Sequence, residues 1–222
     1  MRTVIFDLDG TLADTSGDLL AAANAAFIRA GHPAPLLPGD APTALIGGRP
    51  MLRLGSARLE LGWDEAEIDR QYRVLIDAYA DGIAVHTRLY DGALDAIERL
   101  RREGIAVGVC TNKPDHLAEA LLRELGVRDM FGTMIGANTL PVRKPDPAPL
   151  LRAIADLGGA PGQACMIGDT ITDRATGEAA GVPVVLVTFG PEGHEVTRHR
   201  PDALLHHYDA LDATVAPFLA RN

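Results

Sequence analysis

Two aspartates stand two positions apart, directly after the first apolar segment of the chain. Residues 3–6 are apolar, Asp7 follows them, and Asp9 precedes Gly10. Side chains at positions i and i+2 of an extended segment point to the same side. Adjacent carboxylates repel each other unless a cation or a proton separates them. The pair is therefore either a polar turn or part of a metal site, and further ligands elsewhere must decide between the two.

A second group of acids follows a later apolar segment. Asp169 and Asp173 come shortly after residues 164–167, on either side of a Thr-Ile-Thr stretch. Taken alone, this arrangement is also typical of a helix N-cap. Together, Asp7, Asp9 and Asp169 offer the oxygen ligands that Mg²⁺ prefers. The sequence therefore predicts a magnesium site.

Three more polar residues could bind an anion beside that metal. Thr111 and Asn112 follow the apolar segment 105–110 and precede Pro114, where a helix can begin. Backbone N–H groups at the start of a helix attract anions, although a polar residue there is often an ordinary cap. Lys144 stands directly before a proline, and a lone loop lysine is usually solvated. These residues indicate an anion site only if the fold brings them to the acids.

The elements that would bring these residues to the acids are short apolar segments that alternate with helical patterns. The segments are residues 3–6, 105–110, 133–136, 164–167 and 182–187. They are apolar on both faces, which is typical of parallel strands covered by helices on each side. We therefore expect a doubly wound α/β fold, in which ligands bind at the carboxyl ends of the strands. Each polar group described above follows such a strand or precedes the next one.

One stretch interrupts this alternation. Residues 16–85 contain no strand signal, but they contain apolar residues at helical spacing and an Asp64–Glu67 capping pair. Four prolines between residues 33 and 42 indicate a turn-rich loop. We expect a small all-helical domain at 15–85, inserted into a core made of 1–14 and 86–222. A short edge strand at 201–205 and a final helix complete the predicted core.

Composition limits the classes of partner. Lysine and arginine number 21 against 30 acidic residues, a formal net charge of −9, which disfavours nucleic acid and acidic membranes. No apolar run approaches the ~20 residues of a membrane span, and no leader segment is visible. Cys110 and Cys165 lie in apolar segments without metal-binding spacing, as expected in the cytoplasm. A monomer and a homodimer are both compatible with the sequence.

Taken in order, the four polar groups resemble the motifs of the haloacid dehalogenase superfamily, and the likeness spans essentially the whole chain. The matching stretches are Asp-Leu-Asp-Gly-Thr at the start, Thr-Asn, the lysine before proline, and Gly-Asp-x-x-x-Asp. The helical insert is similar to the small cap domain of that superfamily. Asp14-Thr15, Thr-Asn-Lys-Pro and the Gly-Gly-Arg stretch at 47–49 further resemble phosphoglycolate phosphatases.

The resemblance implies a role for each of these acids. Asp7 would be the nucleophile that forms an aspartyl-phosphate, and Asp9 the acid and base that serves the leaving oxygen and then water. Mg²⁺ would be held by Asp7, the backbone carbonyl of Asp9, and Asp169. Asp173 would orient a metal-bound water or the lysine.

The same resemblance implies how a small anionic phosphoester, such as 2-phosphoglycolate, would be bound. Thr111, the Asn112 amide and Lys144 would hold the phosphoryl oxygens. A loop is expected at 46–50 of the insert, and Arg49 in this loop would reach the carboxylate, although a solvated arginine at a helix start is an equally ordinary interpretation. Arg53 is a spare candidate, and Trp63 is expected in the core of the insert.

Other activities remain open at this point. A sugar phosphate phosphatase, a phosphomutase or a pyrophosphatase of the same superfamily would share the core motifs. Phosphomutases typically carry a histidine shortly after the Asp-Thr pair, and this chain has Gly17-Asp18 there. Dehalogenases lack an aspartate at the position of Asp9. A phospho-accepting signalling domain could share the acids, the threonine and the lysine, but it would not need a lid or Asp9.

Overall fold

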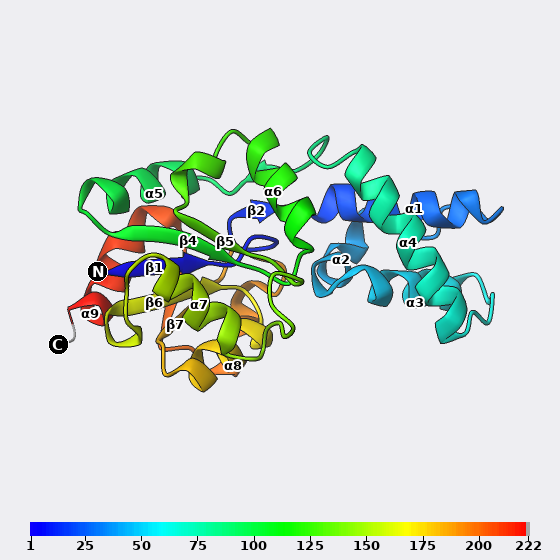
Figure 1. The fold of residues 1–222 in the computed structure, drawn as a ribbon. Coiled ribbons are helices and arrows are strands. Elements are labelled where there is room, and N and C mark those ends of the chain that lie inside the picture. Colours follow the sequence, from blue (N-terminus) through cyan, green and yellow to red (C-terminus); the bar gives the residue numbers. More distant parts are fainter. Residues whose placement is uncertain (221–222) are drawn as a thin grey trace. The chain divides into compact units, whose positions relative to one another are not determined.

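The computed structural model describes residues 1–220 and divides into two compact units. The first, here called the core unit, consists of residues 1–14 together with the described residues from 89 onward, and the second, the insert unit, consists of residues 15–88. The sequence predicts the end of the insert at residue 85, and this boundary stays a prediction. Figure 1 shows both units and the course of the chain through them.

A six-stranded parallel sheet forms the centre of the core unit, in the order β5-β4-β1-β6-β7-β8. Its strands are β1 (Thr3–Phe6), β4 (Ala106–Cys110), β5 (Thr133–Ile135), β6 (Ala164–Gly168), β7 (Val184–Val187) and β8 (Ala203–Leu205). Phe6 pairs with both Val109 and Ile167. The residues that follow β1, β4 and β6 therefore emerge at one edge of the sheet. The predicted α/β class with a parallel sheet is confirmed, including the edge strand near the C-terminus.

Helices cover the sheet of the core unit. They are α5 (Ala93–Arg102), α6 (Asp115–Glu124), α7 (Ala148–Asp156), α8 (Ile171–Ala180) and α9 (Leu211–Leu219). Helix α5 contacts α9, and α7 contacts α8. Leu150 and Ile154 of α7 join Ile5, Met166 and Val184 of the strands in one buried cluster. This cluster is the reason why the strands are apolar on the face toward α7.

The regular structure of the insert unit is helical from residue 16 to residue 81. It contains α1 (Ser16–Arg29), α2 (Ala41–Ile46), α3 (Gly48–Arg58) and α4 (Glu65–Asp81). Asp64 caps α4 by accepting a hydrogen bond from the N–H of Glu67, as the capping pair predicted. The ring of Trp63 stacks on buried Phe27 with ring centroids 4.7 Å apart, but Trp63 itself is only half-buried, so it lies at the margin of the insert's core and not within it.

Two local predictions in the insert were wrong. The proline-rich segment 33–42 is not entirely loop, because α2 begins at Ala41 and includes Pro42 in its first turn. A proline in that turn removes an N–H that would have no helical partner anyway. The expected loop at 46–50 consists of Gly47 alone, with φ +138°, so that Arg49 lies in the first turn of α3.

The remaining short elements connect these larger ones. They are β2 (Ala13–Asp14), β3 (Arg88–Leu89) and 3₁₀ turns at Pro38–Asp40, Arg128–Met130, Pro161–Gln163, Gly193–His199 and Tyr208–Ala210. None of the helices within 1–220 is long and apolar enough to cross a bilayer.

Candidate active site

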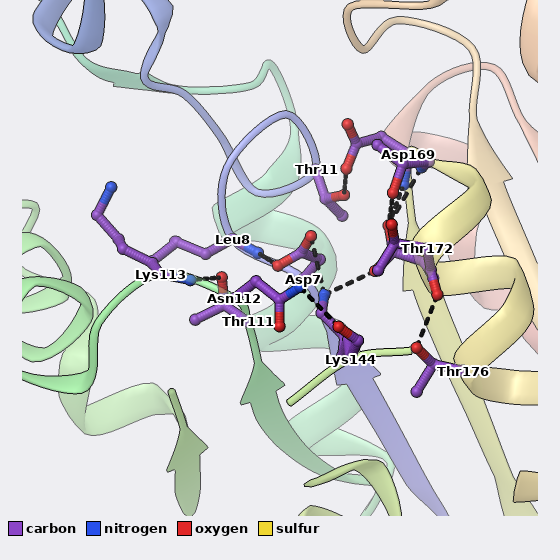
Figure 2. A network of polar contacts seen from close by, with 12 residues as sticks. Asp7, Leu8, Thr11, Thr111, Asn112, Lys113, Lys144, Asp169, Thr172 and Thr176 are labelled. Carbon is purple, nitrogen blue, oxygen red and sulfur yellow. Dashed lines mark hydrogen bonds and ion pairs between the residues drawn. The ribbon is translucent and has the colours of Figure 1, made fainter. Parts of the chain in front are cut away.

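Three carboxylates converge at the carboxyl edge of the sheet. One oxygen each of Asp7, Asp169 and Asp173 lies within 4.8 Å of the other two. Asp7 follows β1 and Asp169 follows β6, and these strands are hydrogen-bonded neighbours. Asp173 belongs to the first turn of α8. Figure 2 shows Asp7 and Asp169 facing the same region, with Lys144 beside Asp7.

Asp173 connects this edge to Lys144. Its Oδ1 accepts a 2.6 Å hydrogen bond from the Lys144 ammonium. Its Oδ2 accepts hydrogen bonds from the backbone N–H of Asp169 and from the N–H and hydroxyl of Thr170. A Cβ on Gly168 would lie 2.4 Å from the Asp173 Cβ, so only glycine fits there. Asp173 thus holds both the lysine and the turn that carries Asp169.

Lys144 is a buried ammonium shared between two carboxylates. Its Nζ lies 3.0 Å from Asp7 Oδ2, and its side chain is only 2% exposed. Burial by itself lowers the pKa of Lys144, but the nearby charges of Asp173 and Asp7 outweigh burial and raise the pKa above its ordinary value. The lysine therefore stays charged, and it places a fixed positive charge beside Asp7.

The two carboxylates that face each other across the site resist ionisation. Burial raises the pKa of Asp7 to about 6, against the attraction of Lys144 and with added repulsion from Asp173. Burial, with repulsion from Asp173 and Asp7, raises the pKa of Asp169 well above its ordinary value. Buried acids in such proximity are stabilised by a proton or by a cation between them.

Asp169 supplies the observation that favours a cation. Its Oδ1 accepts a 2.7 Å hydrogen bond from the hydroxyl of Thr11, whereas its buried Oδ2 has no hydrogen-bond partner. A Cβ on Gly10 would lie 2.4 Å from that Oδ2. An unpartnered buried carboxylate oxygen is costly, and hard oxygen donors suit a hard divalent cation. The three aspartates therefore fit a possible metal site.

Asp9 lies outside this three-carboxylate group and has a cation of its own. The Nζ of Lys113 lies 2.9 Å from Asp9 Oδ1, and the Lys113 side chain is 4% exposed. No sequence pattern predicted a role for Lys113. The available signal was its position two residues after Thr111, at the same strand end. Thr11, which holds Asp169, was missed as well.

The predicted anion-binding residues lie on the loop after β4. Thr111 is buried, and its hydroxyl accepts a hydrogen bond from the backbone N–H of Lys113. The side-chain amide of Asn112 donates to the backbone carbonyl of Lys144 at 3.0 Å. Asn112 therefore ties the lysine loop to the loop after β4, so that its side-chain N–H is used within the protein.

Arg49 is engaged within the insert unit. Its Nε lies 2.8 Å from Asp69 Oδ1, and its guanidinium carbon lies 4.0 Å above the ring of Tyr72. Arg53, the spare candidate, forms two hydrogen bonds with Glu65. Both arginines thus have acidic partners on the surface of the insert.

Comparison with known proteins identifies the family to which the chain belongs. A family described as haloacid dehalogenase-like hydrolase matches residues 1–181. The chain belongs to this hydrolase family. That membership favours a hydrolase over a phospho-accepting signalling domain, and the family's name covers the predicted superfamily.

Individual relatives of this hydrolase match nearly its whole length. A phosphoglycolate phosphatase of Mesorhizobium japonicum is 38% identical over 218 residues, which is 98% of this chain and 96% of the relative. One from Cereibacter sphaeroides is 37% identical over 225 residues, covering 99% of this chain and all of the relative. A crystal structure from Haemophilus somnus, named as a predicted phosphoglycolate phosphatase, has a TM-score of 0.84 at 25% identity, covering 95% of this chain and 96% of that one.

Proposed function

We propose that this hydrolase cleaves 2-phosphoglycolate to glycolate and phosphate through an aspartyl-phosphate on Asp7. The observation that carries the proposal is the convergence of Asp7, Lys144 and the partly unpartnered Asp169 at one edge of the sheet. Such an arrangement suits a phosphoryl group, which needs a nucleophile and concentrated positive charge. The names of the relatives support the choice of substrate.

The metal in this proposal is Mg²⁺, which the carboxylates of Asp7 and Asp169 and the backbone carbonyl of Asp9 would hold. The buried Asp169 Oδ2 supports the assignment, because it is a hard oxygen donor that has no hydrogen-bond partner within the protein. When bound, Mg²⁺ would supply positive charge that lessens the repulsion between the anionic phosphoryl group and the Asp7 carboxylate. Asp173, whose oxygens are bonded to Lys144 and to the turn before α8, serves to orient the lysine.

Asp7 and Asp9 carry the bond-making steps. A carboxylate oxygen of Asp7 attacks phosphorus, the ester oxygen leaves, and Asp9 gives that oxygen a proton. In the second step Asp9 removes a proton from water, the water oxygen attacks the same phosphorus, and the Asp7 carboxylate is released. The N–H of Leu8 donates a 2.7 Å hydrogen bond to Asp7 Oδ1, which helps to fix the nucleophile.

Fixed positive charge and N–H donors stabilise the phosphoryl group during both steps. Lys144 stands 3.0 Å from Asp7 and would contact a phosphoryl oxygen attached there. The Thr111 hydroxyl and the Asn112 backbone amide would bind further oxygens. Preorganised charge of this kind supplies most of the rate in phosphoryl transfer.

The insert unit would act as a cap that excludes bulk water from the site. Arg49 remains a candidate for the substrate carboxylate, although it would have to leave Asp69. We further propose that the enzyme works in the cytoplasm as a monomer or homodimer. The buried free thiols of Cys110 and Cys165 suit a reducing compartment.

A phosphate-release assay tests the proposal. The purified protein is given 2-phosphoglycolate, p-nitrophenyl phosphate, a hexose phosphate and pyrophosphate, each with Mg²⁺ and with EDTA. We expect many turnovers with Mg²⁺, the highest kcat/KM on 2-phosphoglycolate, and no turnover in EDTA or in Asp7→Asn. A higher kcat/KM on the hexose phosphate or pyrophosphate contradicts the substrate, and unchanged activity in Asp7→Asn contradicts the nucleophile.

A further inference from the structure

Lys113 is a buried cation beside the site, and it has no role in the proposed mechanism. It follows Asn112 on the loop after β4, and its Nζ lies 2.9 Å from Asp9 Oδ1. In the view of Figure 2, Lys113 and Asp169 lie on opposite sides of Asp7. Burial of an ammonium is unfavourable without an anionic partner. The Lys113–Asp9 pair also opens to solvent at its acidic end, since the Asp9 side chain is 18% exposed and that of Lys113 is 4% exposed.

We propose that Lys113 binds the carboxylate of the leaving group and thereby selects 2-phosphoryloxy carboxylates as substrates. This inference rests on the proposed function, because it takes the leaving oxygen to lie beside Asp9. In a glycolyl ester the carboxylate is attached to the carbon that bears the ester oxygen. Standard bond lengths then put a carboxylate oxygen roughly 3 Å from the ester oxygen. That reach brings the carboxylate to the ammonium that contacts Asp9.

In this proposal each lysine binds one anionic end of the substrate: Lys144 binds the phosphoryl group, and Lys113 binds the carboxylate. Lys144 contacts Asp7 and Asp173, on the side where the phosphoryl group is transferred. Lys113 contacts Asp9, on the side from which the leaving group departs. An ammonium has three N–H donors, so it can contact Asp9 and a substrate oxygen together. A neutral leaving group of the same size gains no charge-assisted hydrogen bond from Lys113.

A substrate pair isolates this contact. Lys113→Met keeps most of the volume of the side chain and removes its charge. For wild type and variant, kcat/KM is measured with 2-phosphoglycolate and with 2-hydroxyethyl phosphate, which carries a hydroxymethyl group in place of the carboxylate. Both substrates are assayed on one preparation, so any loss of folded enzyme cancels in their ratio. We expect the variant to lose about 10- to 100-fold of the preference for 2-phosphoglycolate, and Lys113→Arg to keep part of it.

A second measurement reads the contact without catalysis. Calorimetry compares binding of 3-phosphonopropionate, the inert isostere of 2-phosphoglycolate, with binding of 3-hydroxypropylphosphonate in the presence of Mg²⁺. We expect Lys113→Met to weaken the binding of 3-phosphonopropionate, which carries the carboxylate, and to leave the binding of 3-hydroxypropylphosphonate unchanged. Arg102→Ala removes an exposed cation of α5, is the control, and is expected to leave the preference in place. Arg49→Ala is measured beside it to test the competing assignment to the insert.

Three results would overturn the inference. Equal losses on both substrates would make Lys113 a residue that only positions Asp9, with the proposed function intact. Loss of the preference in Arg49→Ala but not in Lys113→Met would assign the carboxylate to the insert. Wild-type protein that hydrolyses neither ester would remove the proposed function itself, and the inference with it.

Discussion

Replacement of the nucleophile by its neutral isostere is expected to stabilise the protein in the absence of metal. Burial raises the pKa of Asp7 from 3.8 to about 6, although Lys144 acts in the opposite direction. The folded state therefore holds an ionised Asp7 less well than the unfolded chain does. At 1.36 kcal/mol for each pKa unit, Asp7→Asn removes a cost of about 3 kcal/mol.

The sign of this effect fixes its pH dependence. Below the unfolded pKa of 3.8 both states carry a protonated Asp7, and the charge contributes nothing. Between that value and about 6 the unfolded chain loses its proton first, so wild type loses stability relative to the variant. Above about 6 the difference is constant. At about pH 5 roughly half of the full difference is expected.

Urea unfolding in EDTA, followed by circular dichroism at about pH 5 and at pH 7.5, measures the effect. Asp77→Asn, at an exposed position of α4, is the control and is expected to change the free energy of unfolding by less than about 0.5 kcal/mol. A variant that is less stable than wild type at pH 7.5 would refute the reasoning. An equal difference at both pH values would refute it as well, because desolvation of the charge requires the difference to grow with pH.

Three further changes are expected to act through other contacts. Lys144→Met leaves Asp173 buried without its ion pair, and chemical denaturation is expected to show a loss of about 3–5 kcal/mol; a loss below 1 kcal/mol would contradict the buried pair. Asp169→Asn is expected to abolish the rise in Tm that Mg²⁺ gives wild type, and an undiminished rise would exclude Asp169 as a ligand. The hydrogen bond from Arg58 holds the pKa of Asp40 at about 2, so Asp40 stabilises the insert above its unfolded pKa, and this contribution disappears as pH falls through about 2. With allowance for solvent screening, Asp40→Asn is expected to lower the free energy of unfolding by about 1 kcal/mol at pH 7. Denaturation of both proteins at decreasing pH measures this difference, and a difference that persists below about pH 2 would contradict the prediction.

The sheet was predictable because its strands have an unusual pattern. Residues 3–6 and 164–167 are apolar at successive positions, which is typical of short strands covered on both faces. A parallel sheet then brings the ends of β1, β4 and β6 to one edge, so Asp7 and Asp169 could be expected to meet. The helical insert was predictable from helical spacing and from the cap at Asp64.

The missed features depend on contacts that no local pattern encodes. A lysine in a loop is usually solvated, and the burial of Lys113 follows from the fold around Asp9. Thr11 hydrogen-bonds to Asp169, which lies 158 positions away in the chain. The first turn of α2 was hidden by Pro42, because a proline is compatible with both a loop and a helix start.

The central claim is that Asp7 accepts the phosphoryl group. The Asp9→Asn variant, which lacks the base for the second step, is mixed with Mg²⁺ and p-nitrophenyl phosphate, whose leaving group needs no acid. After an acid quench and proteolysis, mass spectrometry is expected to find the phosphoryl group on the Asp7 side chain. Release of phosphate by wild type without any phosphorylated Asp7 in the variant, together with full turnover in Asp7→Asn, would contradict the claim.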